Sequence, residues 1–186
     1  MTEDPNSLFS PFSQKLAAQK LAAEISEAWG KVPIPTREHF TQILVDNPLI
    51  VQREIAGKKM DAFDPLKPEL YHESWLQGLQ PVAAAYYCAA LILQILRTIT
   101  SESDEVICWD FPDICLLSFL AKDRHDTEFL KALSIPSQAA LRKFILFILP
   151  YVKNNKGLED LSSGLVRTAS HLANPKFDDE IFQKGT

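Results

Sequence analysis

Hydrophobic residues are most concentrated near the middle of the chain, where twelve apolar or aromatic residues follow one another from Val82 to Leu93. No charged residue appears in this stretch until Arg97. A helix that is apolar on every side has to be surrounded by other parts of the protein. Twelve residues are fewer than the roughly 20 that a membrane span needs, so the pattern predicts a buried core helix over about 81–100.

Amphipathic spacing predicts three further long helices. The first extends over 10–29, with Ser10 placed as its N-cap and Pro11 at the first helical position. The second opens at 136–137 and repeats apolar residues with helical spacing up to Val152, and Pro150 is expected to kink or end it. The apolar stripe of the second helix consists of Leu141, Phe144, Ile145, Ile148, Leu149 and Val152. The third extends from Gly157 to about 173.

Shorter helices are expected between these long ones. A helix capped by Thr36, a helical turn or two over 49–55, and pieces at 68–76 and 127–133 fit the positions of the prolines and glycines. The apolar run within 106–120 is compatible with a strand or a buried helix, because a short run does not distinguish them by periodicity. We favour a helix over 112–120.

These elements predict an all-α fold, an irregular single-domain bundle of six to eight helices around the central apolar helix. No stretch has the strict alternation of a half-buried strand, and no internal repeat of fixed period is present. We expect a flexible tail over 1–9, one helical domain over 10–174 and a C-terminal tail over 175–186.

Charge and composition restrict the classes of partner. The chain of 186 residues has a formal net charge of -5, and it contains few arginines, whereas a nucleic-acid footprint needs clustered basic side chains. The start of the sequence is acidic and polar, without the basic and apolar stretches of a secretory signal. We therefore expect a cytoplasmic protein that binds neither nucleic acid nor membrane.

Glycine, cysteine and histidine spacing argues against the common catalytic and cofactor motifs. The six glycines are at least seven positions apart, which excludes standard phosphate-binding loops, dinucleotide fingerprints and nucleophile elbows. The three cysteines form no CxxC pair, and the four histidines are scattered singly. We expect no cofactor and no metal, and the sequence favours a protein that is not an enzyme.

Acidic and aromatic residues provide the candidate binding surface. Acidic side chains gather around Trp109, and tyrosine and tryptophan often anchor interfaces, although core packing explains the same aromatics. Tyr86 and Tyr87 are adjacent on a helix and point about 100° apart, so we expect that they do not face the same neighbour. The candidate binding residues are Trp75, Tyr86, Asp104, Glu105, Trp109 and Asp110.

The order of several motifs resembles an uncharacterised bacterial family of small helical proteins known only as a domain of unknown function. The motifs are EISEAWGKVPIP, EIAGKKMDAF, LQPVAAAYYCAALILQILR and PSQAALRKFILFIL, and they span about residues 24–152. Met60 stands where the family pattern leads us to expect tryptophan. The resemblance implies a helical fold and brings no known activity or catalytic residues.

Three functions remain open at this stage. The first is a non-catalytic interaction domain, such as an accessory or immunity-type factor, that binds a protein partner through the acidic and aromatic surface. The second is a small-molecule binder with a pocket between the central helix and the loop 58–80. The third is an enzyme whose site is assembled from distant residues: His72, Glu73, His125 and Asp126. A homodimer is also considered, because closed two-fold pairs are the commonest assemblies.

Overall fold

A computed structural model describes residues 11–30, 32–36, 39, 55–60, 62, 76, 79–101, 111–122 and 126–173. Throughout these residues the regular secondary structure is helical, without strands, so the predicted all-α bundle is confirmed. The helices are α1 (Pro11–Trp29), α3 (Pro81–Ser101), α4 (Phe111–Ala121), α5 (Asp126–Ala132), α6 (Ile135–Lys153) and α7 (Leu161–His171). The helices expected after Thr36 and over 68–76, and both tails, lie almost wholly outside the described residues.

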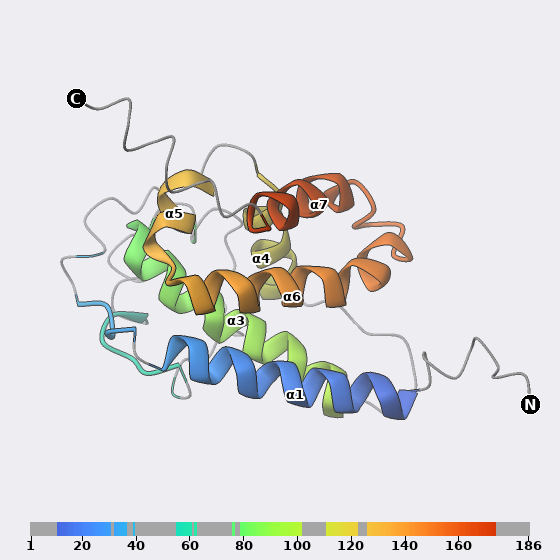
Figure 1. Cartoon of the computed structure of the whole chain (residues 1–186), viewed down its shortest axis with the longest axis horizontal. Coiled ribbons are helices and arrows are strands. Elements are labelled where there is room, and N and C mark those ends of the chain that lie inside the picture. The colour runs from blue at the N-terminus through green and yellow to red at the C-terminus, as the bar shows by residue number, and fades with distance from the viewer. Residues whose placement is uncertain are drawn as a thin grey trace, which may run out of the picture.

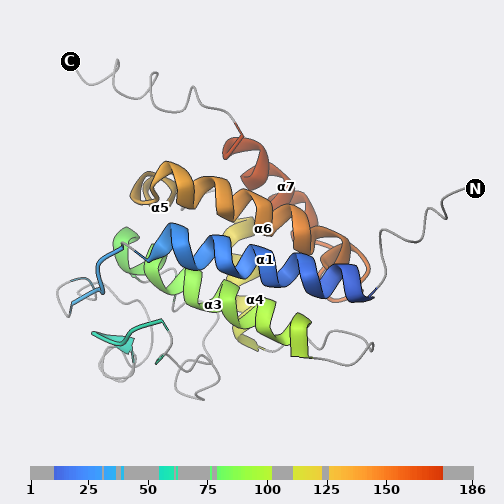
Figure 2. The same ribbon diagram turned by 60° about the horizontal axis from the view of Figure 1, so that its bottom comes forward.

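Five of the helices form a closed ring of neighbours. Helix α3 packs on α1 and α4, α4 packs on α7, α7 packs on α6, and α6 returns to α1, while α5 lies against α3. Figure 1 shows α1 and α6 side by side across the front of the molecule, with α7 above α6. The turned view in Figure 2 keeps α1 next to both α6 and α3. The buried faces of all these helices form one hydrophobic cluster.

Helix α3 is the core helix that its sequence predicts. Every residue from Ala83 to Ile92 is buried, and α3 contacts three other helices. Among the described residues, α3 is also a helix long and apolar enough to cross a membrane, but 72% of its apolar window is buried inside the protein. This burial is what a core helix requires.

Helix α6 begins one residue before its predicted opening at 136–137, carries the expected stripe and extends beyond Pro150. The Ser134 hydroxyl oxygen accepts a hydrogen bond from the Ser137 main-chain N–H, which satisfies one free donor of the first turn. The helix includes Pro150 and ends at Lys153, so the expectation that Pro150 ends it is wrong. Pro150 is exposed and Leu146 is 46% exposed. Water can therefore satisfy the Leu146 carbonyl, which a proline at position 150 leaves without its helical donor.

The last helix begins later than predicted. Helix α7 begins at Leu161, whereas the sequence pattern places its start at Gly157. The Asn155 side-chain oxygen accepts a hydrogen bond from the Gly157 N–H at 2.9 Å, and residues 156–160 form turns. Asparagine side chains compete with helical hydrogen bonds in this way, which explains the delayed start.

Helices α4 and α7 approach each other closely. The Thr168 hydroxyl donates a hydrogen bond to the Leu120 carbonyl oxygen at 2.6 Å, and both residues are buried. One turn earlier on α7, a Cβ at Gly164 would lie 2.2 Å from the Ala121 carbonyl oxygen. The contact therefore requires glycine at position 164, because any side chain would overlap the α4 backbone.

Candidate functional site

A groove opens between the N-terminal half of α1 and the C-terminal half of α6. Three contacts set the alignment of the two helices: Ser137 with Ala28, Lys143 with Glu24, and Tyr151 with Gln14. Along these contacts the residue numbers rise on α6 as they fall on α1, so the two helices are antiparallel. The groove forms towards the first turns of α1, where the short side chains of Ser13 and Ala17 leave space between the two helices.

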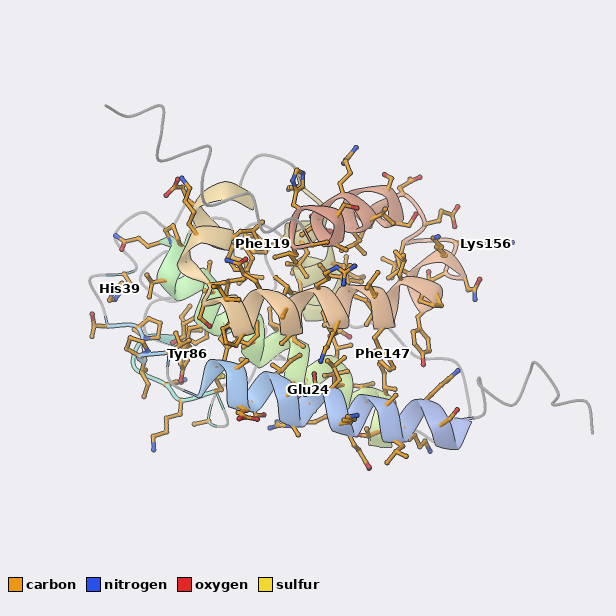
Figure 3. All side chains as sticks on the ribbon, in the orientation of Figure 1. Glu24, His39, Tyr86, Phe119, Phe147 and Lys156 are labelled. Carbon is orange, nitrogen blue, oxygen red and sulfur yellow. The ribbon has the colours of Figure 1, made fainter. Side chains whose placement is uncertain are left out.

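The groove is lined by apolar and aromatic side chains together with a few polar ones. Its volume is about 520 Å³, within the range of about 300–1,000 Å³ that is typical of ligand sites. In Figure 3, Phe147 lies on the side of α6 that faces α1. The Phe147 and Tyr151 rings are 5.9 Å apart, so they form a continuous aromatic wall. The lining residues are Ser13, Gln14, Ala17, Phe147, Pro150, Tyr151 and Asn154.

Two of the contacts between α1 and α6 join polar side chains on both helices. The Tyr151 hydroxyl donates a hydrogen bond to Gln14 Oε1 at 3.0 Å, and burial raises the pKa of Tyr151. Further along, Lys143 Nζ lies 2.6 Å from Glu24 Oε2. The hydrogen bond and charge of Lys143 lower the pKa of Glu24, with a smaller contribution from Lys20. Glu24 therefore stays ionised and is already matched by nearby lysines.

Two exposed leucines extend the apolar surface beyond the groove. Leu16 is 57% exposed and lies three residues after the lining residue Ser13, and Leu146 is 46% exposed and lies four residues before the lining residue Pro150, so each shares a helix face with a lining residue. They belong to the few large hydrophobic side chains that are substantially exposed in the described part of the chain. A contiguous exposed apolar surface marks a place where a partner or ligand binds.

Lysines border this surface. The first ten residues of α1 include Lys15 and Lys20 but no acidic residue, and the sequence of α6 contains basic residues without an acidic one. Lys20 lies three residues after Ala17, and Lys153 lies three residues after Pro150, so each lies on the same helix face as a lining residue. Both lysines are exposed. The parts of α1 and α6 that border the groove therefore carry more basic than acidic side chains, although the whole chain has a charge of -5.

The described residues contain no group of three or more histidine, cysteine or acidic side chains that could hold a metal ion. Cys88 and Cys115 are buried free thiols. Complete burial raises the pKa of Cys88, which disfavours the nucleophilic thiolate. The chemistry that the groove offers is apolar contact together with hydrogen bonding.

Tyr86, one of the candidate binding residues, is buried with only 3% of its surface exposed. Its hydroxyl oxygen accepts a hydrogen bond from the Met60 N–H at 3.1 Å, while the Tyr87 hydroxyl donates to the Ile55 carbonyl oxygen. The expectation that the two tyrosines face different neighbours is therefore wrong, since both reach the segment 55–60. Their rings also meet edge to face at 5.2 Å. Tyr86 and Tyr87 leave the helix in different directions, but both side chains are long enough to reach the segment 55–60.

The other predicted binding residues lie outside the described residues: Trp75, Asp104, Glu105, Trp109 and Asp110. The same holds for His72, Glu73 and His125 of the dispersed catalytic site, and the structure does not describe the Asp126 side chain. Most of the loop 58–80, which was expected to border a pocket, is also outside. These sites stay predictions. Of the acidic residues that the sequence places around Trp109, Asp113 is described, and it is buried in the first turn of α4.

Sequence reasoning did not identify the groove between α1 and α6. A signal was present in the repeat of α6, because Leu146, Phe147 and Pro150 extend the apolar content beyond the buried stripe. What the sequence did not contain was the alignment of α6 with α1, which brings Ala17 opposite these residues.

Comparisons of the chain with protein-family models, with curated proteins and with solved structures give no match. The interpretation of function therefore depends on the geometry of the groove.

Proposed function

We propose that this protein is a non-catalytic interaction domain that binds a protein partner in the groove between α1 and α6. The observation that carries the proposal is the exposure of Leu16 and Leu146, each of which lies within one helical turn of a residue that lines the groove. A binding surface that extends over two helices fits a partner better than a small ligand, because a small ligand would cover the groove and leave the leucines in water.

The second candidate is a small-molecule binder, and the groove itself favours it. The groove volume of about 520 Å³ and the mixture of aromatic side chains with a few polar groups are typical of ligand pockets. This pocket differs from the one predicted beside the loop 58–80, because α1 and α6 form it.

Site-specific photo-crosslinking tests the proposal. A photoreactive phenylalanine analogue replaces Leu146 in the full chain, which is expressed in cells of the organism that encodes it. The matched control places the same analogue at Val166, which is similarly exposed, at 41%, but lies on α7. We expect a discrete protein adduct from position 146 that is absent from position 166.

A groove-blocking variant makes the result specific. Ala17 is exposed and lines the groove, so Ala17→Glu fills the groove without disturbing the core. The variant is expected to abolish the adduct at 146 and to retain the helical circular dichroism spectrum. An adduct that survives Ala17→Glu, or the same adduct from 146 and 166, contradicts the proposal. Binding of a small molecule without any protein adduct supports the second candidate instead.

The acidic and aromatic surface predicted from the sequence is a separate proposal for the same function. An affinity pull-down compares the native chain with a variant in which Asp104, Glu105 and Asp110 are replaced by their amides. A protein captured by the native chain and lost from this variant, but retained by Ala17→Glu, would place the interface at the acidic surface rather than in the groove.

A further inference from the structure

We propose that the occupant of the groove is an amphipathic helix of a partner protein, with leucine or phenylalanine on its inner face and acidic residues beside them. This inference rests on the proposed function and adds the chemistry of the partner. Its two parts are the shape of the groove, which selects a helix, and the charge of its borders, which selects acidic residues.

The shape follows from the antiparallel pairing of α1 and α6. Two helices packed side by side leave a groove along their outer surface. A third helix can bind in such a groove with apolar side chains spaced i, i+3, i+4 and i+7. Here the short side chain of Ala17 leaves the groove open on the α1 side, and Phe147 and Pro150 line it on the α6 side. Leu16 and Leu146 would cover the flanks of the bound helix.

The acidic character of the proposed partner helix is inferred from the lysines around the groove. Lys20 and Lys153 are exposed and lie within one turn of lining residues, and Lys15 follows the lining residue Gln14. The nearest acidic side chain of α1 is Glu24, beyond the groove, and it already pairs with Lys143. On α1 and α6 around the groove, the positive charges of Lys15, Lys20, Lys143 and Lys153 outnumber the single nearby carboxylate of Glu24. An acidic partner helix would therefore meet a net positive charge there, whereas a basic helix would be repelled.

Fluorescence anisotropy with two matched peptides tests the chemistry. The first is a labelled helical peptide of about 16 residues, with leucine or phenylalanine at i, i+3, i+4 and i+7 positions and glutamates on its flanks. The second has lysine in place of every glutamate. We expect the full-length protein to bind the glutamate peptide at least about tenfold more tightly, with affinity that falls as salt rises.

Three variants locate the binding. Ala17→Glu is expected to weaken the glutamate peptide about tenfold or more, and the double change Lys20→Glu with Lys153→Glu is expected to reverse the preference between the peptides. The matched control Lys122→Glu adds the same kind of charge at an exposed residue after α4 and is expected to leave binding unchanged. Equal or tighter binding of the lysine peptide overturns the inference, as does binding that Ala17→Glu does not weaken.

The outcomes separate this inference from the proposed function. If neither peptide binds while the photoreactive group at position 146 still yields an adduct that depends on Ala17, the interaction domain stands and the acidic-helix partner is wrong. If the protein binds vesicles of anionic lipid through the groove in place of the glutamate peptide, or if sedimentation shows that a second copy of the chain occupies the groove, the inference is likewise overturned.

Discussion

The indole N–H of Trp29 donates a hydrogen bond to the main-chain carbonyl oxygen of Ala85, at a distance of 2.9 Å, across 56 positions of sequence. Trp29 is the last residue of α1 and is completely buried, and Ala85 lies in the first turns of α3. The hydrogen bond therefore ties the end of α1 to the start of the core helix. It satisfies the polar atom that a buried tryptophan brings into the core.

Replacing Trp29 with phenylalanine should lower the free energy of unfolding by about 1–3 kcal/mol, because the variant loses the hydrogen bond and part of the packed volume. Chemical denaturation followed by circular dichroism measures the change. The control Leu16→Ala removes an exposed side chain and should stay within about 0.5 kcal/mol of the native chain. A loss at Trp29 no larger than at Leu16 would show that the buried contact contributes nothing.

Tyr86 and Tyr87 hold the segment 55–60 on α3, so removing their hydroxyl groups should release that segment. Tyr87→Phe leaves the buried Ile55 carbonyl without this donor, and Tyr86→Phe leaves the Met60 N–H without this acceptor. We expect each variant to lose about 0.5–2 kcal/mol of stability and to be cut faster by trypsin after Lys58 or Lys59.

Cleavage after Lys153 serves as the internal control for both tyrosine variants, because this exposed lysine lies at the end of α6, away from the tyrosines. Faster cutting at Lys153 and Lys59 alike would indicate general unfolding. Unchanged cutting at Lys59 would mean that the two hydroxyl groups do not hold the segment.

Gly164→Ala should destabilise the protein by about 1–3 kcal/mol, since the added methyl group overlaps the Ala121 carbonyl oxygen of α4. Alanine is the better helix former by about 1 kcal/mol, so a loss of stability would show that the backbone contact outweighs propensity. Gly157→Ala is the matched control, because its nearest neighbour there is the Asn155 side chain at 3.4 Å. If thermal unfolding finds Gly164→Ala as stable as Gly157→Ala, the close contact of α4 with α7 is wrong.

Stability should fall in alkaline solution partly because of Cys88. Burial raises the pKa of this thiol in the folded protein, so above about pH 8.5 the unfolded chain releases the proton more readily and is favoured. The stabilising difference is present below the unfolded pKa and is lost as pH rises, by at most about 1.4 kcal/mol per pH unit for one group.

The variant Cys88→Ala should therefore show a shallower decline in unfolding free energy between about pH 8.5 and 10 than the native chain. Guanidinium titrations at several pH values measure both slopes. Between about pH 6 and 8 the two proteins should differ by a constant amount, because the thiol is protonated in both states. Parallel curves over the whole range would mean that Cys88 does not titrate on unfolding.

Local sequence signals predicted the helices well wherever those signals act within one segment. Pro11 at the first position of α1 and the apolar run of α3 fixed these helices to within one residue of the predicted bounds. The residues 136–137 likewise marked the start of α6, which begins at Ile135. Caps, prolines and periodicity depend on residues a few positions apart, so the sequence reveals them without knowledge of the tertiary structure.

Local competition explains the two wrong helix bounds. The alternative in which Pro150 ends α6 is wrong, because Pro150 lies on an exposed part of the helix, where water can satisfy the carbonyl that proline leaves free. The start of α7 was placed too early because the apolar spacing continues through Leu158, although the Asn155 side chain forms a turn there. In both cases the surroundings of one residue decided the bound.

The sequence by itself determined that this chain is an all-helical bundle with α3 in its core, because burial of apolar residues with helical spacing leaves few alternatives. Only the tertiary structure decided which helices became neighbours. The groove depends on the antiparallel alignment that places Ala17 opposite Phe147, and the shared contact of Tyr86 and Tyr87 depends on where 55–60 crosses α3. Such alignments are set by the packing of whole surfaces, which no local pattern of residues records.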